Sequence, residues 1–220
     1  MTDPNFIETI DILESNKILY WLCHGTLLGI IRDKKLIPWD DDIDIAVFKS
    51  DVDFEKIKKI FEIRGFINTN VNISGSIHFR KKGGRNVDIN FYQKIDKDKH
   101  GVIWKLPKKL IFFRILHVVV NDTEYFGKNI NFIKILKKLK PIFRGVIFLL
   151  DIWKLTYVTK GYTVPSTLLE HFIYIENDSI KLRVPKENIA VCNYTYGESW
   201  NKPIKKFDWE KDSPSTKIFQ

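Results

Sequence analysis

The spacing of hydrophobic and polar positions predicts alternating helices and strands in the first half of the chain. Apolar residues recur at helical intervals in 5–16 and in 50–64, which indicates two amphipathic helices. Residues 27–32 have the length of a short helix. Short apolar runs bounded by glycine or polar residues are typical of strands. We expect strands over 18–23, 40–48, 66–71, 76–80 and 86–92, with Gly83-Gly84 forming a hairpin turn between the last two.

The second half has a less regular pattern. Three of its apolar segments fit short helices as well as strands: 102–105, 111–120 and 123–126. Residues 129–140 place apolar and lysine side chains on opposite sides of a helix, and Pro141 interrupts this pattern. Further along we expect a helix, a linker and a short helical segment, over 143–158, 161–165 and 194–197 respectively.

Composition and charge narrow the class of protein. The chain has 220 residues, of which 44% are hydrophobic and 14% aromatic, and this is enough for one globular domain and excludes disorder as the main state. Its 36 Lys and Arg residues against 27 Asp and Glu give a net charge of +9, which attracts phosphate-bearing molecules. Because no zinc finger, RNP signature or basic heptad region accompanies this charge, we expect no nucleic-acid partner.

Several features predict the cellular location. Cys23 and Cys192 are too few for a disulfide framework and indicate reduced thiols. The N-terminal residues lack the basic and apolar regions of a signal peptide, and no uninterrupted apolar run reaches about 18 residues. We therefore expect a cytoplasmic protein. The basic amphipathic stretch 129–158 leaves open a peripheral contact with an anionic membrane at its inner face, although we expect its apolar face to pack into the domain.

The strongest chemical signal lies in residues 38–47. Alternation in a strand places three carboxylates on one face and three apolar side chains on the other. The carboxylates are those of Asp40, Asp42 and Asp44, and the apolar residues are Ile43, Ile45 and Val47. Carboxylates this close repel one another unless a cation lies among them, and a hard divalent ion with oxygen ligands is the natural partner.

Two other interpretations compete with a metal site. Acidic clusters are often solvated loops, but a solvated loop has no need of the apolar residues in 43–47. An EF-hand loop begins with the same aspartate spacing. Its glycine would fall at Ile45, however, and its bidentate glutamate would fall at Asp51, whose side chain is one methylene too short. We therefore favour a metal site on a strand.

Three further features fit metal-dependent phosphoryl transfer. His24-Gly25-Thr26 follows a predicted strand, where a glycine lets backbone amides approach a phosphate and a hydroxyl can hydrogen-bond it. Asp88 is an isolated acid in the strand expected over 86–92, and a neighbouring strand would bring it to the other carboxylates. Arg32 and Arg80 lie near these elements in the sequence. Taken singly, each feature is weak, since such residues are more often surface charges or structural.

Together these segments resemble the LicD/fukutin family. The matching segments are His24–Gly29, Arg32, Ile37–Ile45, Val87–Tyr92, Tyr196–Pro203 and Asp208-Trp209, whereas 95–185 match poorly. The resemblance implies the α+β fold of nucleotidyltransferase-like enzymes, a mixed β-sheet flanked by helices, with a mostly helical C-terminal half. Within one domain it implies a catalytic core over 1–95 and an acceptor-binding, closing segment over 96–220.

The resemblance also implies a reaction. Family members move a phospho-alcohol group such as phosphocholine from a CDP-activated donor to a sugar hydroxyl of a surface glycan or glycolipid, and CMP leaves. By analogy, Asp42, Asp44 and Asp88 would be catalytic and would bind Mg²⁺ or Mn²⁺, with Asp40 as a further acid of the metal site. Asp88 would also accept the proton of the attacking hydroxyl. The implied substrate-binding residues are His24, Gly25, Thr26, Arg32 and Arg80.

Two alternatives stay open. A sugar-1-phosphate transferase or a plain nucleotidyltransferase could use the same scaffold, and nucleotidyl transfer would release pyrophosphate instead of CMP. A non-catalytic protein that binds a metal or a nucleotide would keep the acids for structure, so that replacing Asp42 or Asp44 would reduce stability and leave function intact.

Overall fold

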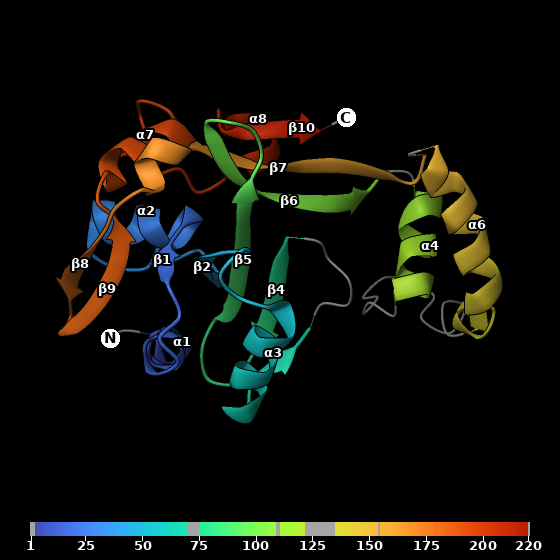
Figure 1. Cartoon of the computed structure of the whole chain (residues 1–220), viewed down its shortest axis with the longest axis horizontal. Coiled ribbons are helices and arrows are strands. Elements are labelled where there is room, and N and C mark those ends of the chain that lie inside the picture. Colours follow the sequence, from blue (N-terminus) through green and yellow to red (C-terminus); the bar gives the residue numbers. More distant parts are fainter. Residues whose placement is uncertain (1–2, 70–74, 109–110, 122–134, 154, 220) are drawn as a thin grey trace.

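A mixed β-sheet of eight strands forms the centre of the protein (Figure 1). The computed structural model describes residues 3–69, 75–108, 111–121, 135–153 and 155–219. The strand path runs β1-β2-β5-β6-β7-β10, and β4 and then β3 branch from β5. Only β2 and β5 pair in parallel, and the other neighbours in this described sheet are antiparallel. The predicted α+β class, a mixed sheet flanked by helices, is confirmed.

The described first half follows the predicted order of helices and strands. Its elements are α1 (Pro4–Ser15), β1 (Tyr20–Leu22), α2 (His24–Asp33), β2 (Asp42–Phe48), α3 (Phe54–Ile63), β3 (Ile67–Asn68), β4 (Ser76–Arg80) and β5 (Asn86–Lys94). Several boundaries differ from the prediction, and two helix starts differ by three residues or more. The helix expected from residue 50 begins at Phe54 with Asp53 as its N-cap, and α2 already begins at His24. The end of the strand expected over 66–71 lies outside the described residues.

The second half is mixed rather than mostly helical. Its elements are β6 (Lys99–Pro107), α4 (Ile111–Asn121), α6 (Lys140–Ile152), β7 (Tyr157–Pro165), the 3-10 helix η1 (Ser166–Leu169), β8 (Phe172–Asn177), β9 (Ile180–Pro185), α7 (Asn188–Tyr196), α8 (Trp209–Asp212) and β10 (Thr216–Phe219). The linker predicted over 161–165 is wrong, because these residues pair with β6 along their whole length. Valine and threonine are frequent in β7, and β-branched side chains favour an extended backbone.

In the second half, two further predicted elements extend outside the described residues at 122–134. The segment 123–126 lies outside them, as does the start of the helix expected over 129–140, of which 135–138 are helical. The helix expected over 143–158 corresponds to α6, which starts at Lys140 and ends at Ile152. Within the described ranges, no helix combines the length and the apolar character needed to cross a membrane.

The central sheet continues across residue 95, where we expected the core to give way to a closing segment. The end of β5 pairs with β6, with Gln93 opposite Gly101. One hydrophobic cluster also joins the two parts, since it includes Phe6 of α1 and Cys192 of α7. Side chains from before and after residue 95 can therefore line the same side of the sheet.

The start of α1 fixes the turn between β4 and β5. The side-chain amide of Asn5 donates hydrogen bonds to the carbonyls of Lys81 and Arg85, at 2.9 and 2.8 Å. Gly83 has a φ of +103°, a conformation that favours glycine. Because β4 and β5 pair on either side of this turn, the predicted hairpin is confirmed.

The pattern of burial in β2 agrees with the predicted alternation. Ile43, Ile45 and Val47 are fully buried in the core, whereas Asp42 and Asp44 are partly exposed on the other face. Burial of these three apolar side chains fixes the register of β2 against its neighbours, since a shift by one residue would turn the carboxylates into the core.

Replacing Gly161 by alanine is expected to destabilise the protein. A Cβ there would overlap the carbonyl oxygen of Val102 on the paired strand, so β6 and β7 would have to separate. We expect the free energy of unfolding, measured in urea, to fall by about 2–4 kcal/mol. Gly145→Ala is the matched control: its Cβ meets nothing within 4 Å, and alanine in a helix is expected to stabilise by up to about 1 kcal/mol. Equal stability of the two variants would contradict the β6–β7 register.

Candidate active site

The parallel pairing of β2 and β5 brings the predicted aspartates together. Asp44 lies directly opposite Asp88 in this register. Oxygen atoms of Asp42, Asp44 and Asp88 lie within 4.8 Å of one another, close enough to share one cation. Asp40, just before β2, forms a second such group with Asp41 and Asp42. The structure thus gathers all four aspartates that the sequence proposed for a metal site.

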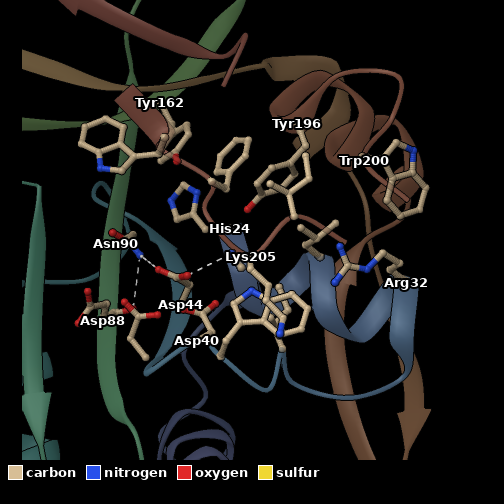
Figure 2. Close-up of a pocket in the computed structure, with 18 of the residues that line it drawn as sticks. His24, Arg32, Asp40, Asp44, Asp88, Asn90, Tyr162, Tyr196, Trp200 and Lys205 are labelled. Carbon is tan, nitrogen blue, oxygen red and sulfur yellow. Dashed lines mark hydrogen bonds between the residues drawn. The ribbon is translucent and has the colours of Figure 1, made fainter. Parts of the chain in front are cut away.

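Backbone and amide groups hold Asp44 in place. Its carboxylate accepts hydrogen bonds from the backbone N–H of Gly25 at 3.2 Å and from the side chain of Asn90 at 3.4 Å (Figure 2). A Cβ at residue 25 would overlap the carboxylate of Asp40, so this side chain would have to shift to make room for any residue other than glycine. The buried hydroxyl of Thr26 accepts a hydrogen bond from the N–H of Asp44 at 2.8 Å. Thr26 therefore fixes β2, whereas Gly25 lines the cleft.

The carboxyl groups of Asp40, Asp42 and Asp44 resist simultaneous ionisation. Burial, followed by the charge of Asp40, raises the pKa of Asp42 to about 8. Burial, followed by the charges of Asp42 and Asp88, raises the pKa of Asp44 well above its usual value, and burial also raises the pKa of Asp40. A divalent cation among these groups would remove the repulsion. Clustered carboxylate oxygens are the ligands that Mg²⁺ and Mn²⁺ prefer, so the residues present fit such an ion.

The cation-free protein is expected to lose stability as the pH rises. Asp42 has a pKa near 4 in an unfolded chain and about 8 in the folded protein, so the folded state holds this proton more tightly. Its stabilising contribution is complete below about pH 4 and is lost as the pH rises through about 8. In urea with a chelator, we expect the free energy of unfolding to be about 2–5 kcal/mol lower at about pH 8.5 than at about pH 5.

Two controls isolate the contribution of the cluster. Asp42→Asn should reduce the pH dependence, because an amide does not titrate. Added Mn²⁺ should restore the stability of the unmodified protein at the higher pH, since a ligand that binds only the folded state stabilises it. A pH dependence identical in the protein and in Asp42→Asn would contradict this electrostatic account.

His78 was not among the site residues that we selected from the sequence, yet it contacts Asp88. It lies opposite Asp88 in the antiparallel β4–β5 pair, and its Nδ1 is 2.7 Å from a carboxylate oxygen of Asp88. Its Nε2 is 2.9 Å from the hydroxyl of Ser76, which accepts a hydrogen bond from the indole N–H of Trp104. Counting back through the Gly83-Gly84 turn from Asp88 would have indicated this histidine.

The carboxylates lie at one end of a cleft of about 500 Å³. Aromatic side chains from three parts of the chain form much of the rest of its wall (Figure 2). They are Trp39 before β2, Trp104 and Tyr162 from β6 and β7, and Tyr196, Trp200, Phe207 and Trp209 from the C-terminal segment. The cleft can therefore take a ligand that carries phosphate at one end and a flat or apolar group at the other.

His24 belongs to the buried wall of the cleft. Its ring lies between aromatic side chains, with centroids 4.3 Å from Tyr162 and 6.1 Å from Tyr92. Burial lowers the pKa of His24 to about 3, so the ring is neutral at physiological pH. Its backbone adopts a φ of +44° at the start of α2, which is uncommon for a residue with a side chain. These contacts place His24 at the cleft. Its ring is neutral there and does not offer a positive charge to a phosphate.

The two predicted arginines occupy different places. Arg32 lines the cleft on the side away from the carboxylates and donates two hydrogen bonds to Asp33, at 2.9 and 2.7 Å (Figure 2). Arg80 is exposed and borders a separate depression of about 300 Å³, on which Asp42 and Asp88 also open. Lys202 and Lys205, which we did not select from the sequence, line the main cleft.

Comparison with known proteins gives a family match and several relatives. Residues 17–142, more than half of the chain, match the family model described as LicD/FKTN/FKRP, nucleotidyltransferase domain. Human ribitol-5-phosphate transferase FKTN is 23% identical over 231 residues, covering 97% of this chain and 39% of that protein. The lipopolysaccharide cholinephosphotransferase LicD of Haemophilus influenzae is 50% identical over 40 residues, covering 18% of this chain and 15% of that protein.

A third relative has no assigned activity. It is an uncharacterized protein of Rickettsia typhi, 36% identical over 93 residues, which cover 42% of this chain and 28% of that protein. The chain thus spans less than half the length of each of these three relatives.

Proposed function

The chain belongs to the LicD/FKTN/FKRP family, and we propose that it is a metal-dependent transferase of phospho-alcohol groups. It takes a group such as phosphocholine from a CDP-activated donor, attaches it to a sugar hydroxyl of a glycan or glycolipid, and releases CMP. The observation that carries this proposal is the cluster of Asp42, Asp44 and Asp88 at one end of an aromatic cleft. Two relatives are named as transferases of ribitol 5-phosphate and of choline phosphate, both of which are phospho-alcohols.

In this proposal Asp42, Asp44 and Asp88 hold Mg²⁺ or Mn²⁺, with Asp40 beside them. A bound divalent ion neutralises charge on the donor phosphates. The residues around the ion hold the donor still, because phosphoryl transfer depends chiefly on position and on neutralised charge. Gly25 lets the phosphates come close to the start of α2, and Lys202 and Lys205 attract the anionic donor into the cleft.

Asp88 has a second role in the proposal, as acceptor of the proton from the attacking sugar hydroxyl. It is the one carboxylate of the cluster in contact with a histidine among the described residues, through the 2.7 Å contact with His78. His78 would orient Asp88 and share the proton, while Ser76 and Trp104 hold the far side of the imidazole.

The aromatic wall fits the organic part of the substrates. Trp104, Tyr162 and Trp209 lie within 6 Å of one another by ring centroids and form a continuous surface. Flat aromatic surfaces stack on nucleobases and on the apolar faces of sugars. We assign this surface to the cytidine or to the acceptor sugar.

The small product of the reaction tests the proposal against its alternatives. The protein is incubated with Mn²⁺, a short glycan acceptor and CDP-choline, CDP-ribitol or CDP-glycerol, and products are separated by chromatography and mass spectrometry. We expect CMP together with an acceptor heavier by one phospho-alcohol group. Pyrophosphate formed from CTP would instead indicate a nucleotidyltransferase, and transfer from a nucleotide sugar would indicate a sugar-1-phosphate transferase. Binding of a CDP-alcohol without turnover of any donor would favour a non-catalytic protein.

A further inference from the structure

A helical hairpin lies at the end of the β6–β7 ribbon, away from the elements that form the site. It consists of α4 and α6, which follow β6 and precede β7 in the chain (Figure 1). Leu116, Val119 and Ile147 are buried and belong to the two packed helices. Packing between the two helices therefore buries part of the apolar residues of the hairpin.

The outer surface of the hairpin is also apolar. On and just after α6, the exposed fractions are 69% for Phe148, 62% for Leu149, 61% for Ile152 and 77% for Trp153. Phe112 on α4 and Ile142 on α6 are more than half exposed as well. A helix that is apolar on its inner and outer sides is expected in an apolar environment, and water-exposed apolar surface of this extent marks an interaction site.

The charge of this region is predominantly positive. Its basic residues in the described chain are Lys108, Arg114, Lys137, Lys138, Lys140 and Arg144. Asp151 on α6 is the single acidic residue among the described residues from 99 to 153. Apolar side chains flanked by lysine and arginine are the combination that binds the interface of an anionic bilayer. The basic side chains there interact with the lipid phosphates. A second copy of the chain on this surface would bring two predominantly basic segments together, whereas an anionic bilayer supplies an excess of negative charge.

We propose that the α4–α6 hairpin docks peripherally on an anionic lipid bilayer, with its exposed apolar side chains in the interfacial region. The β6–β7 ribbon links the hairpin to the cleft, because β6 contributes Trp104 and β7 contributes Tyr162 to the cleft wall. Docking would therefore hold the cleft near a membrane surface. This proposal does not depend on the transferase reaction and is tested without it.

Flotation of the full chain with lipid vesicles tests the proposal at physiological salt. We expect binding to vesicles that contain phosphatidylglycerol and much weaker binding to phosphatidylcholine alone. Phe148→Ser/Trp153→Ser removes exposed apolar groups, and Lys138→Glu/Arg144→Glu reverses two charges. Each double variant should reduce partitioning to anionic vesicles by about tenfold or more. Retained melting temperature and circular dichroism would show that the variants fold.

Matched variants elsewhere on the surface separate a specific site from general basicity. Lys56→Glu/Lys59→Glu on α3 changes the net charge equally at exposed positions, and Ile63→Ser removes an exposed isoleucine. These variants should bind anionic vesicles like the unmodified protein. If the α3 charge variant lost as much vesicle binding as Lys138→Glu/Arg144→Glu, the proposal would be overturned, because the binding would then come from non-specific attraction between a basic protein and anionic lipid.

Quenching by lipids brominated in the acyl chain reports insertion directly. We expect the tryptophan fluorescence of the unmodified protein to be quenched on binding, and Trp153→Phe to lose most of that quenching while it still floats. Absence of flotation with anionic vesicles would overturn the proposal. So would a dimer in sedimentation velocity that Phe148→Ser/Trp153→Ser converts to monomer, since a second copy would then cover the surface.

Discussion

Replacing Asp42 by asparagine is expected to lower the rate of transfer by about 10³-fold, which corresponds to about 4 kcal/mol of transition-state stabilisation. The same change should make the cation-free protein more stable. Burial and the neighbouring Asp40 raise the pKa of Asp42 to about 8, so near pH 8 the folded protein carries the strain of a buried, repelling carboxylate. Asparagine is neutral and of nearly the same shape, and its amide can donate a hydrogen bond to Asp40. We expect the free energy of unfolding at pH 8 to rise by about 1–3 kcal/mol.

The opposite signs of these two effects separate a catalytic role from a structural one. Turnover is measured as CMP release, and stability is measured by urea unfolding in a chelator. Asp51→Asn is the matched control, since Asp51 is an exposed aspartate beyond the other end of β2, and it should change neither quantity. If Asp42→Asn lowered stability and left turnover intact, the acids would be structural and the enzymatic proposal would be wrong.

Chelation of divalent cations is expected to abolish turnover, with a fall of at least about 10³-fold and full recovery on addition of Mg²⁺ or Mn²⁺. The reason lies in the cluster itself, where Asp42, Asp44 and Asp88 place oxygen atoms within 4.8 Å of one another. Without a cation, burial and mutual repulsion favour the protonated forms of Asp42 and Asp44, whose pKa values are raised. Donor phosphates would then lack the positive charge that the ion supplies at the end of the cleft.

Competition between protons and the cation gives this prediction a second readout. Because Asp42 must lose its proton to bind the ion, the cation concentration at half-maximal rate should fall as the pH rises from about 6 to about 8. Asp42→Asn should require more cation and should show a weaker dependence on pH. Undiminished turnover in the presence of a chelator would contradict the metal-dependent mechanism.

The aspartate cluster could be predicted because its signal is local. Asp42 and Asp44 are two residues apart in a strand whose intervening Ile43 is apolar, and period-two alternation alone puts their carboxylates on one face. The prediction that Asp88 belongs to the cluster required one assumption, that β5 lies beside β2. The structure meets it through the parallel register that sets Asp44 opposite Asp88.

The rest of the cleft depended on contacts between distant parts of the chain. His78 becomes a site residue only because the antiparallel β4–β5 register sets it opposite Asp88. The side-chain amide of Asn90 on β5 donates a hydrogen bond to Asp44 on the adjacent strand β2. The prediction of a linker over 161–165 failed because Gly161 suggested a break, whereas a close approach to Val102 on β6 is what requires a glycine there.

The sequence by itself determined the elements of the first half and the acidic face of β2, because each depends on residues a few positions apart. It also determined the family resemblance, because each matching motif is a short local segment and the motifs follow one another in order along the chain. Only the tertiary structure decided which aromatic residues line the cleft, that Thr26 holds β2 while Gly25 faces the cleft, and that α4 and α6 leave apolar surface exposed. Those features depend on strand register and on packing between segments up to about two hundred residues apart, and the spacing of residues along one segment carries no information about either.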